Sequence, residues 1–97
     1  MQHMKTLEKA NDIRQARAQA KKEINRGVIT PIDILETQPY YCDSMEIQEL
    51  LLAMHRWGKR RVRKLLEYVN IHPTRRLDDL TVRQRSVLIE TLKEKID

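Results

Sequence analysis

This sequence has no phenylalanine and only one tryptophan, Trp57. Its 97 residues make one small domain, whose core must be built from Leu, Ile, Val, Ala and Met. Two glycines and three prolines are too few for the frequent turns of a β-rich fold. We therefore expect an all-α protein whose helices are joined by short connections.

A single cysteine, Cys42, excludes an internal disulfide and suits a reducing compartment. No apolar run approaches the ~20 residues that a membrane-spanning helix needs, and no signal-peptide pattern is recognised. The histidines and Cys42 lack the spacing of a zinc site, and neither a catalytic triad nor a P-loop is found. We expect a cytoplasmic protein that is not an enzyme and needs no cofactor or metal.

Positive and negative charges are segregated along the chain. Residues 1–27 hold seven Lys and Arg against three acids, whereas residues 28–55 hold five acids and no Lys or Arg. Residues 56–76 hold eight Lys and Arg against the single Glu67, and residues 77–97 are nearly balanced. Soluble helical proteins usually intersperse their charges, so this segregation, with a net charge of +5, indicates an anionic partner.

Helix start and stop signals divide the chain into five helices. Gly27 is typical of a helix C-cap, Ser44 of an N-cap, and Thr81 with Gln84 of a capping box. Apolar residues recur at helical spacing between these signals. The predicted helices cover residues 5–26, a short stretch from Pro31 to before Pro39, 45–55, 59–69 and 82–95, with a turn or short helical piece from Arg75 to Leu80.

These helices imply three parts of the chain. Residues 1–4 resemble a cloning remnant, and residues 5–27 form a long basic helix. Its apolar stripe is thin, so we expect it to dock only at its C-terminal end. We expect residues 28–97 to form a compact helical domain, and the basic clusters described next predict that it binds nucleic acid.

The densest positive charge lies between Arg56 and Lys64, with six cations in nine residues. Val62 and Leu65 belong to the inward face of this helix, so the cations must point outward. Like charges at this spacing destabilise a helix unless an anionic partner offsets their repulsion. Gly58, just before the helix, leaves its first backbone N–H groups open to a phosphate.

A second basic cluster follows at residues 74–76, where a hydroxyl and two guanidiniums suit a neighbouring phosphate. We interpret Asp78 and Asp79 as groups that orient Arg75 and Arg76 or start a helix, rather than as a catalytic pair. The glycine-led helix start and the second cluster disfavour a merely solvated basic face. The predicted nucleic-acid-binding residues are Gly58, Lys59, Arg60, Arg61, Arg63, Lys64, Thr74, Arg75 and Arg76.

The segment from Met45 to Leu92 resembles the actinobacterial, mycobacterial-type integration host factor family. Members carry a stretch that reads approximately M-K-V-x-x-L-L-E-x-L-P-G-V-G-K-V-R-A, then an S-R-R-x-R turn and a closing helix. The counterparts here are Met45-Glu46-Ile47, Leu50-Leu51, Gly58-Lys59, Arg61 and Thr74-Arg75-Arg76. The long basic helix in front extends the resemblance to nearly the whole chain. Arg56 replaces the first glycine and Asp78 the last arginine, so we expect a different loop and a phosphate repelled near Asp78.

The resemblance implies a helix-two-turns-helix element within an all-helical fold and a nucleoid-associated role in a bacterial cytoplasm. It implies binding to double-stranded DNA with little sequence preference, DNA bending and support for site-specific recombination. A recombinase or integrase is then a candidate partner, and we expect a monomer. By position, the resemblance assigns phosphate contacts to Gly58, Lys59, Arg61, Arg75 and Arg76.

Three alternatives stay open at this point. A structured-RNA or ribosome-associated module would use the same phosphate contacts, although the chain has few aromatics for reading single-stranded RNA. The acidic residues 33–49 either receive a basic partner or form a solvated face. Trp57 either packs under the turn as a core anchor or wedges between base pairs.

Overall fold

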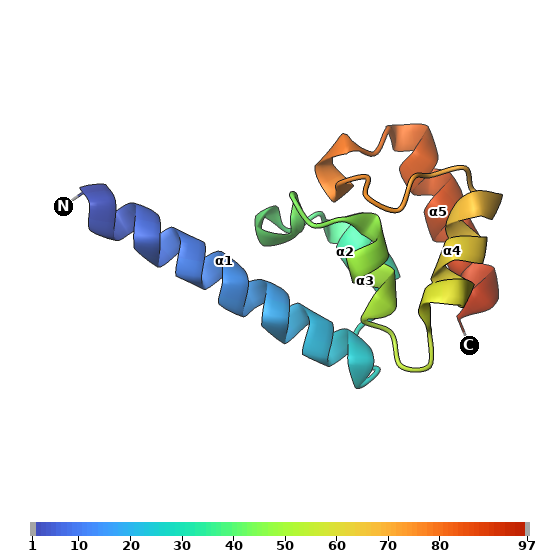
Figure 1. Ribbon diagram of the computed structural model, residues 1–97, viewed down its shortest axis with the longest axis horizontal. Coiled ribbons are helices and arrows are strands. Elements are labelled where there is room, and N and C mark those ends of the chain that lie inside the picture. Colours follow the sequence, from blue (N-terminus) through green and yellow to red (C-terminus); the bar gives the residue numbers. More distant parts are fainter. Residues whose placement is uncertain (1, 97) are drawn as a thin grey trace.

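The computed structural model describes the backbone of residues 2–96 and the side chains of residues 11–96. A long helix, α1 (Gln2–Asn25), extends away from a compact group of shorter helices (Figure 1). That group consists of α2 (Pro31–Thr37), the 3-10 turn η1 (Tyr40–Cys42), α3 (Ile47–Leu52), α4 (Lys59–Tyr68), the 3-10 turn η2 (Leu77–Asp79) and α5 (Val82–Lys95).

The predicted all-α class is confirmed, because the only β pairing within residues 2–96 is an isolated antiparallel bridge between Glu46 and Arg76. Over the same range, no helix is long and apolar enough to cross a membrane. The predicted cloning remnant, residues 1–4, lies outside the residues whose side chains are described.

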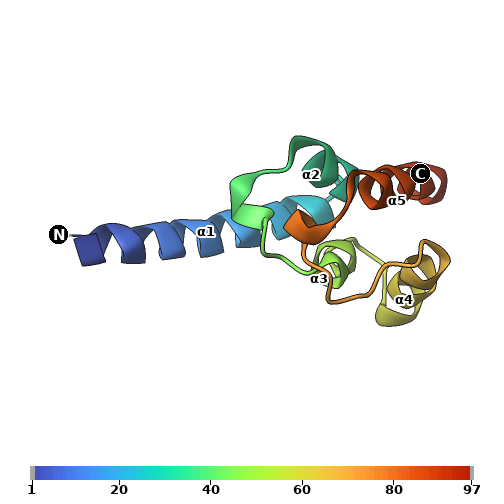
Figure 2. The same ribbon diagram turned by 90° about the horizontal axis from the view of Figure 1, so that it is seen from above.

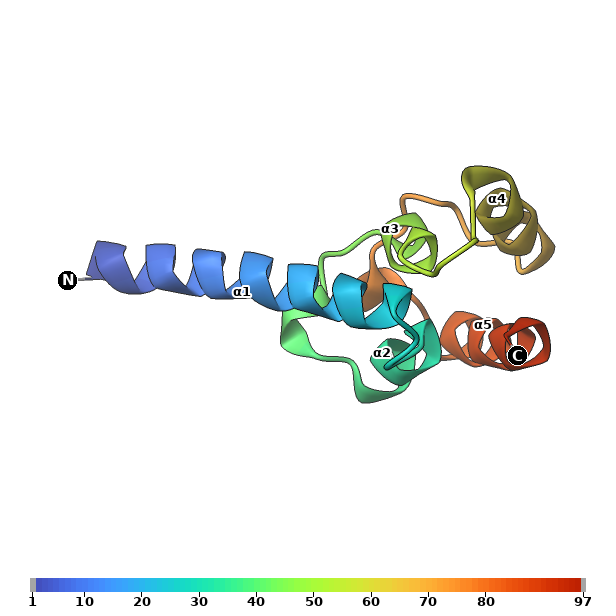
Figure 3. The same ribbon diagram turned by 90° about the horizontal axis from the view of Figure 1, so that it is seen from below.

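The compact part of the molecule has two layers. α3 and α4 lie in one layer and α2 and α5 in the other, as the views from above and below both show (Figure 2, Figure 3). The C-terminal part of α1 packs against η1, while the rest of α1 projects beyond the compact part. This is the one-ended docking that the thin apolar stripe predicts.

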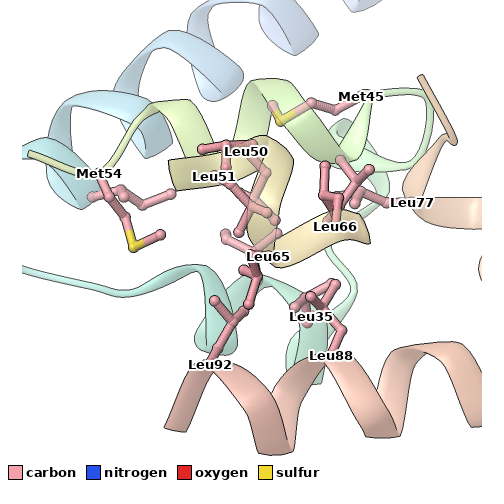
Figure 4. Close-up of a cluster of buried hydrophobic side chains, with 14 of the residues drawn as sticks. Leu35, Met45, Leu50, Leu51, Met54, Leu65, Leu66, Leu77, Leu88 and Leu92 are labelled. Atoms are coloured by element: carbon pink, nitrogen blue, oxygen red, sulfur yellow. The ribbon is translucent and has the colours of Figure 1, made fainter. Parts of the chain in front are cut away.

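Leucine side chains fill the space between the two layers (Figure 4). Leu35 of α2, Leu51 of α3 and Leu88 of α5 are fully shielded from solvent. Each fully buried leucine stabilises the fold by roughly 2 kcal/mol relative to an exposed one. Leu66 of α4 is buried in the same cluster, so this core also holds α4 in a fixed position.

Local signals predict several helix ends correctly. The Thr81 hydroxyl accepts a hydrogen bond from the Gln84 N–H (3.0 Å), and Gln84 Oε1 accepts one from the Thr81 N–H (3.0 Å), which is the predicted capping box. Gly27 ends α1 with a φ of 79°, in the left-handed conformation that glycine favours at a helix end. α4 ends one residue earlier than predicted, where Asn70 turns left-handed at φ 57°.

The predicted start of α3 is wrong. Its N-cap is Glu46, and the Ser44 hydroxyl accepts a hydrogen bond from the Arg17 side chain instead. The free N–H groups at the start of α3 are satisfied from elsewhere in the chain: Ile47 N–H donates to the Arg75 carbonyl oxygen (2.8 Å). A cap supplied by distant backbone leaves no local sequence signal, and α3 is also shorter than the predicted 45–55.

Candidate nucleic-acid interface

The buried face of α4 determines where its cations lie. Val62, Leu65 and Leu66 are buried against the rest of the core, whereas every Lys and Arg of this helix is exposed. With 3.6 residues per turn, Lys59 and Arg63 fall on one flank of α4. Arg60 and Lys64 lie on the outer face of the helix. Arg61 lies on the opposite flank, towards α5.

The N-terminus of α4 is open. Gly58 is its N-cap, and no side chain caps the first turn. The first backbone hydrogen bond is that from Val62 N–H to the Gly58 carbonyl oxygen (3.1 Å). The N–H groups of the three residues between them are therefore free for a ligand, and the helix dipole favours an anion there.

Gly58 contributes by its missing side chain rather than by an unusual backbone. Its φ of −84° and ψ of 175° are available to any residue. A Cβ built at this position would meet nothing within 4 Å, so the space in front of the helix start is empty. A phosphate can use this space to approach the free N–H groups.

The turn that carries the second basic cluster is anchored to α3 by backbone hydrogen bonds. The Pro73 carbonyl oxygen accepts from Gln48 N–H (3.1 Å), and Leu77 N–H donates to the Met45 carbonyl oxygen (3.0 Å). Together with the bond between Ile47 and Arg75, these contacts hold residues 73–77 at the N-terminal end of α3. The turn is thus a rigid platform beside α4, not a free loop.

Thr74 is placed differently from the prediction that its hydroxyl is offered to a phosphate. Its hydroxyl lies 2.7 Å from His72 Nδ1, and its backbone N–H donates to the same nitrogen (3.2 Å). Because the backbone N–H must donate, Nδ1 acts as the acceptor and Nε2 carries the proton. His72 is exposed, so its Nε2–H is an additional donor in this turn that sequence reasoning missed.

Arg75 and Arg76 leave the turn towards different neighbours. Arg75 lines a shallow hollow with Leu66 and Asn70, next to α4. Arg76 pairs with Glu46 in the β-bridge, and directly opposed side chains on such strands lie close together. The two guanidiniums therefore serve separate parts of the surface.

The flank of α4 that carries Lys59 and Arg63 adjoins this turn. The two residues line a hollow of about 260 Å³ together with Gln48 of α3 and Pro73 of the turn. This hollow adjoins the one that Arg75 lines, because Leu66 and Pro73 border both. Lys59, Arg63 and Arg75 therefore lie on one continuous stretch of surface. Arg61 and Lys64 lie apart from it, in a cleft shared with α5.

The cations of this surface are not neutralised within the protein. Among the side chains described, the only ion pair joins Lys21 to Glu49 (2.7 Å). Of the two roles predicted for Asp78 and Asp79, orienting Arg75 and Arg76 through ion pairs is therefore wrong. The other predicted role, a helix start, is supported, because both acids lie in the first turn of η2.

Trp57 packs as a core anchor. It is 8% exposed, and the Arg61 guanidinium lies 4.0 Å from its ring centroid. A wedge between base pairs would need an exposed ring, so the structure contradicts that alternative. The buried ring also explains why Arg61 is held on the flank towards α5, because the cation–π contact fixes it there.

No group of three or more metal-ligating side chains occurs within the described part of the chain. Cys42 is buried, and burial raises the pKa of its thiol. A thiol with a raised pKa is a poor nucleophile, so Cys42 is a structural residue of the core.

The chain is similar over nearly its whole length to two curated proteins. It is 34% identical over 91 residues to the integration host factor of Mycobacterium tuberculosis, covering 92% of this chain and 87% of that protein. It is 36% identical over 92 residues to the integration host factor of Mycolicibacterium smegmatis, with the same coverage of both chains. The chain belongs to the integration host factor family. No protein-family model matches it.

The fold of a solved integration host factor is also similar. The structure described as sIHF bound to an 8bp palindromic DNA matches with a TM-score of 0.76 at 23% identity. The match covers 93% of this chain and 99% of the other. The predicted family and the helical fold with its helix-two-turns-helix element are thereby confirmed, and the family agrees with the expectation of a non-enzymatic protein.

Arg56 departs from the glycine of the family motif, but it takes the backbone conformation that glycine favours. Its φ is 68°, in the left-handed region. A residue with a side chain adopts this left-handed conformation only at some cost in strain. Arg56 is exposed and adds a cation near the start of α4 that the site prediction left out.

Proposed function

We propose that this integration host factor family member binds double-stranded DNA through its phosphates, with little sequence preference, and bends it. One observation carries the proposal: the open N-terminus of α4 lies beside a rigid basic turn, and the cations of both are free of internal ion pairs. The basic segment has many Lys and Arg but few Asn or Gln, and phosphate contacts position a protein without reading bases. The similar solved structure contains bound DNA, which supports the same partner.

Each predicted residue has a proposed role at this surface. The free N–H groups after Gly58, with the Lys59 and Arg60 side chains, hold one phosphate. Arg63 and Arg75 hold neighbouring phosphates along the same strand. The other predicted residues assist. Thr74 positions the turn through His72, and Arg76 extends the surface towards Glu46. Arg61 and Lys64, on the far flank of α4, add positive charge near the duplex without belonging to this surface.

Bending follows from the one-sided placement of these cations. Neutralising phosphates on one side of a duplex leaves repulsion among those on the other side, which favours curvature towards the protein. Such bending matches a nucleoid-associated role in the bacterial cytoplasm.

The name of the relatives suggests a role in integration, and we include support for site-specific recombination in the proposal. A recombinase would contact the acidic residues 33–49, of which Asp33, Glu36 and Asp43 are exposed. The proposed active form is a monomer, which sedimentation of the protein with and without duplex would test.

The first experiment measures affinity for a duplex DNA of about 30 base pairs and a matched duplex RNA across a salt series. With about six to eight phosphates neutralised, the slope of log K against log salt for DNA should be roughly −5 to −7. Arg75→Ala/Arg76→Ala should reduce the slope by up to about two and weaken binding at least tenfold at low salt. End-to-end energy transfer on a labelled duplex should report bending.

The matched control is Lys22→Ala/Lys93→Ala, which removes the same charge from exposed positions on α1 and α5. It should change duplex affinity by no more than about threefold, the share expected from net charge alone. Equal loss in both double variants would show that charge rather than this surface drives binding. Tighter binding to RNA would overturn the DNA assignment.

A further inference from the structure

The flank of α4 that faces α5 bounds a second basic cleft, on the opposite side of the helix from Lys59 and Arg63. The cleft has a volume of about 460 Å³ and lies between α4 and the C-terminal end of α5. The lining side chains that matter here are Trp57, Arg61, Lys64, Tyr68, Glu94 and Lys95.

Two flat groups on α4 border this cleft. Tyr68 is 78% exposed, and among the described residues its ring has neither an aromatic nor a cationic partner. Arg61 lies over the Trp57 ring, 4.0 Å from the centroid. Aromatic rings and guanidinium planes are the groups on which nucleobases stack in single-strand-binding proteins. Arg61 and Tyr68 are seven residues apart, so they share one side of α4 at a spacing of about 10 Å.

The charges of the cleft favour phosphate groups. Lys64 lies between the two flat groups, one turn of helix from each, and Lys95 faces it from α5. Both lysines are exposed, and neither belongs to the one ion pair found among the described side chains. Glu94 is the single acid against three cations, so the cleft attracts an anion.

A duplex does not fit these features, because its bases are stacked on one another and present only their edges. A strand with unpaired bases presents both base faces and phosphates. We infer that this cleft binds a short run of unpaired DNA nucleotides, with bases on Tyr68 and Arg61 and phosphates on Lys64 and Lys95. This activity is distinct from duplex binding and would let the protein hold a frayed or locally opened strand beside the duplex.

The test uses a short oligothymidylate of about eight nucleotides, within the range of known single-strand site sizes. Binding is followed by anisotropy of the labelled strand and by the fluorescence of Trp57, the only tryptophan. The wild-type protein should bind with quenching of Trp57. Tyr68→Ala should weaken binding by at least about fivefold, the low end for loss of one stacked base, whereas Tyr68→Phe should stay within about twofold.

Duplex affinity separates this inference from the proposed function. Tyr68→Ala should leave duplex binding within about twofold of wild type, and Arg75→Ala/Arg76→Ala should lose the duplex but keep the oligothymidylate. An oligothymidylate that does not bind, or that binds Tyr68→Ala as tightly as wild type, overturns the inference even if the duplex binds as proposed. A polyglutamate peptide that competes equally and shows the same Tyr68 dependence would assign the cleft to acidic peptides instead. Circular dichroism melting checks that each variant is folded.

Discussion

α1 and α4 are both rich in Lys and Arg, but the cations of the two helices differ in whether they have partners within the protein. In α1, the Arg17 side chain donates to the Tyr41 carbonyl oxygen and the Ser44 hydroxyl, and Lys21 pairs with Glu49. In α4, no cation takes part in an ion pair among the described side chains, and the first turn has no side-chain cap. Arg17 and Lys21 thus bind α1 to the domain, whereas the cations of α4 are exposed to solvent.

The cause of this difference is what each helix faces. α1 lies against the acidic segment that includes η1 and α3, so Arg17 and Lys21 find acceptors within the chain. α4 packs its apolar face on the core and places its cations where few acids are near. The function of a basic helix is therefore decided by its tertiary neighbours rather than by its charge density.

The largest expected change in stability comes from a substitution on the inward face of α4. Leu66 is 1% exposed, and Leu66→Ala should lower the free energy of unfolding by about 3 kcal/mol through lost burial and the cavity left behind. Urea denaturation measures this, with the exposed Tyr68→Ala as control at less than about 0.5 kcal/mol. Similar values for both variants would mean that α4 is not anchored by the core.

The next effect tests the two basic helices directly. Lys59→Glu/Arg63→Glu should weaken duplex DNA binding on the order of a hundredfold at low salt, because two phosphate contacts become repulsive. Lys22→Glu/Arg26→Glu places the same charge change on exposed positions in the last turn of α1 and directly after it, and should cost less than about tenfold. Fluorescence anisotropy at matched ionic strength compares them, and equal losses would remove the distinction between the helices.

Arg17 should matter for stability. Arg17→Ala removes both hydrogen bonds to residues 41 and 44 and should destabilise the fold by about 1–2 kcal/mol. Labelling of the buried Cys42 thiol, whose pKa is raised by burial, should become roughly tenfold faster as the contact between α1 and η1 opens. Arg14→Ala, at an exposed position on the same helix, should leave the labelling rate unchanged.

Smaller effects on stability and on DNA affinity are expected from a substitution at Arg56. Arg56→Gly should raise the free energy of unfolding by up to about 1 kcal/mol, because glycine adopts a φ of 68° without strain. The same change should weaken duplex binding by about twofold to fivefold through loss of a nearby cation. Thermal unfolding and DNA titration give the two values, and a loss of stability would show that the Arg56 side chain stabilises the fold.

The smallest effect should come from the ion pair of α1. Lys21→Ala should cost about 0.5 kcal/mol or less, because the side chains of Lys21 and Glu49 are 38% and 42% exposed and solvent screens the pair. Urea denaturation at low and high salt should show the difference shrinking as salt rises. A loss of more than about 2 kcal/mol in the free energy of unfolding would mean that this ion pair alone holds α1 against the domain.

Features with local causes were predictable from the sequence. The α5 range 82–95 is correct because the Thr81–Gln84 capping box lies within one turn of the helix start. The inward face of α4 is correct because apolar spacing is a property of the helix itself. The end of α1 at Gly27 follows from the left-handed conformation that glycine favours.

Features that depend on distant partners were not predictable. The start of α3 depends on carbonyl groups of Pro73 and Arg75, more than 20 residues away, so Ser44 was a misleading cap signal. The left-handed conformation of Arg56 and the contact between His72 and the Thr74 hydroxyl were not predictable either. Each depends on the backbone conformation of its turn, which tertiary packing sets.

The helical class, most helix ends, the family and the clustering of positive charge between residues 56 and 76 all follow from the sequence alone. These depend on neighbours along the chain, through hydrogen bonds and spacing within a few residues. Three features follow only from tertiary packing: which cations remain without an ion pair, the position of Lys59 and Arg63 beside the 73–77 turn, and the separate cleft that Arg61 and Lys64 line. Those outcomes depend on how α3, α4 and α5 pack, which brings together residues that the sequence keeps apart.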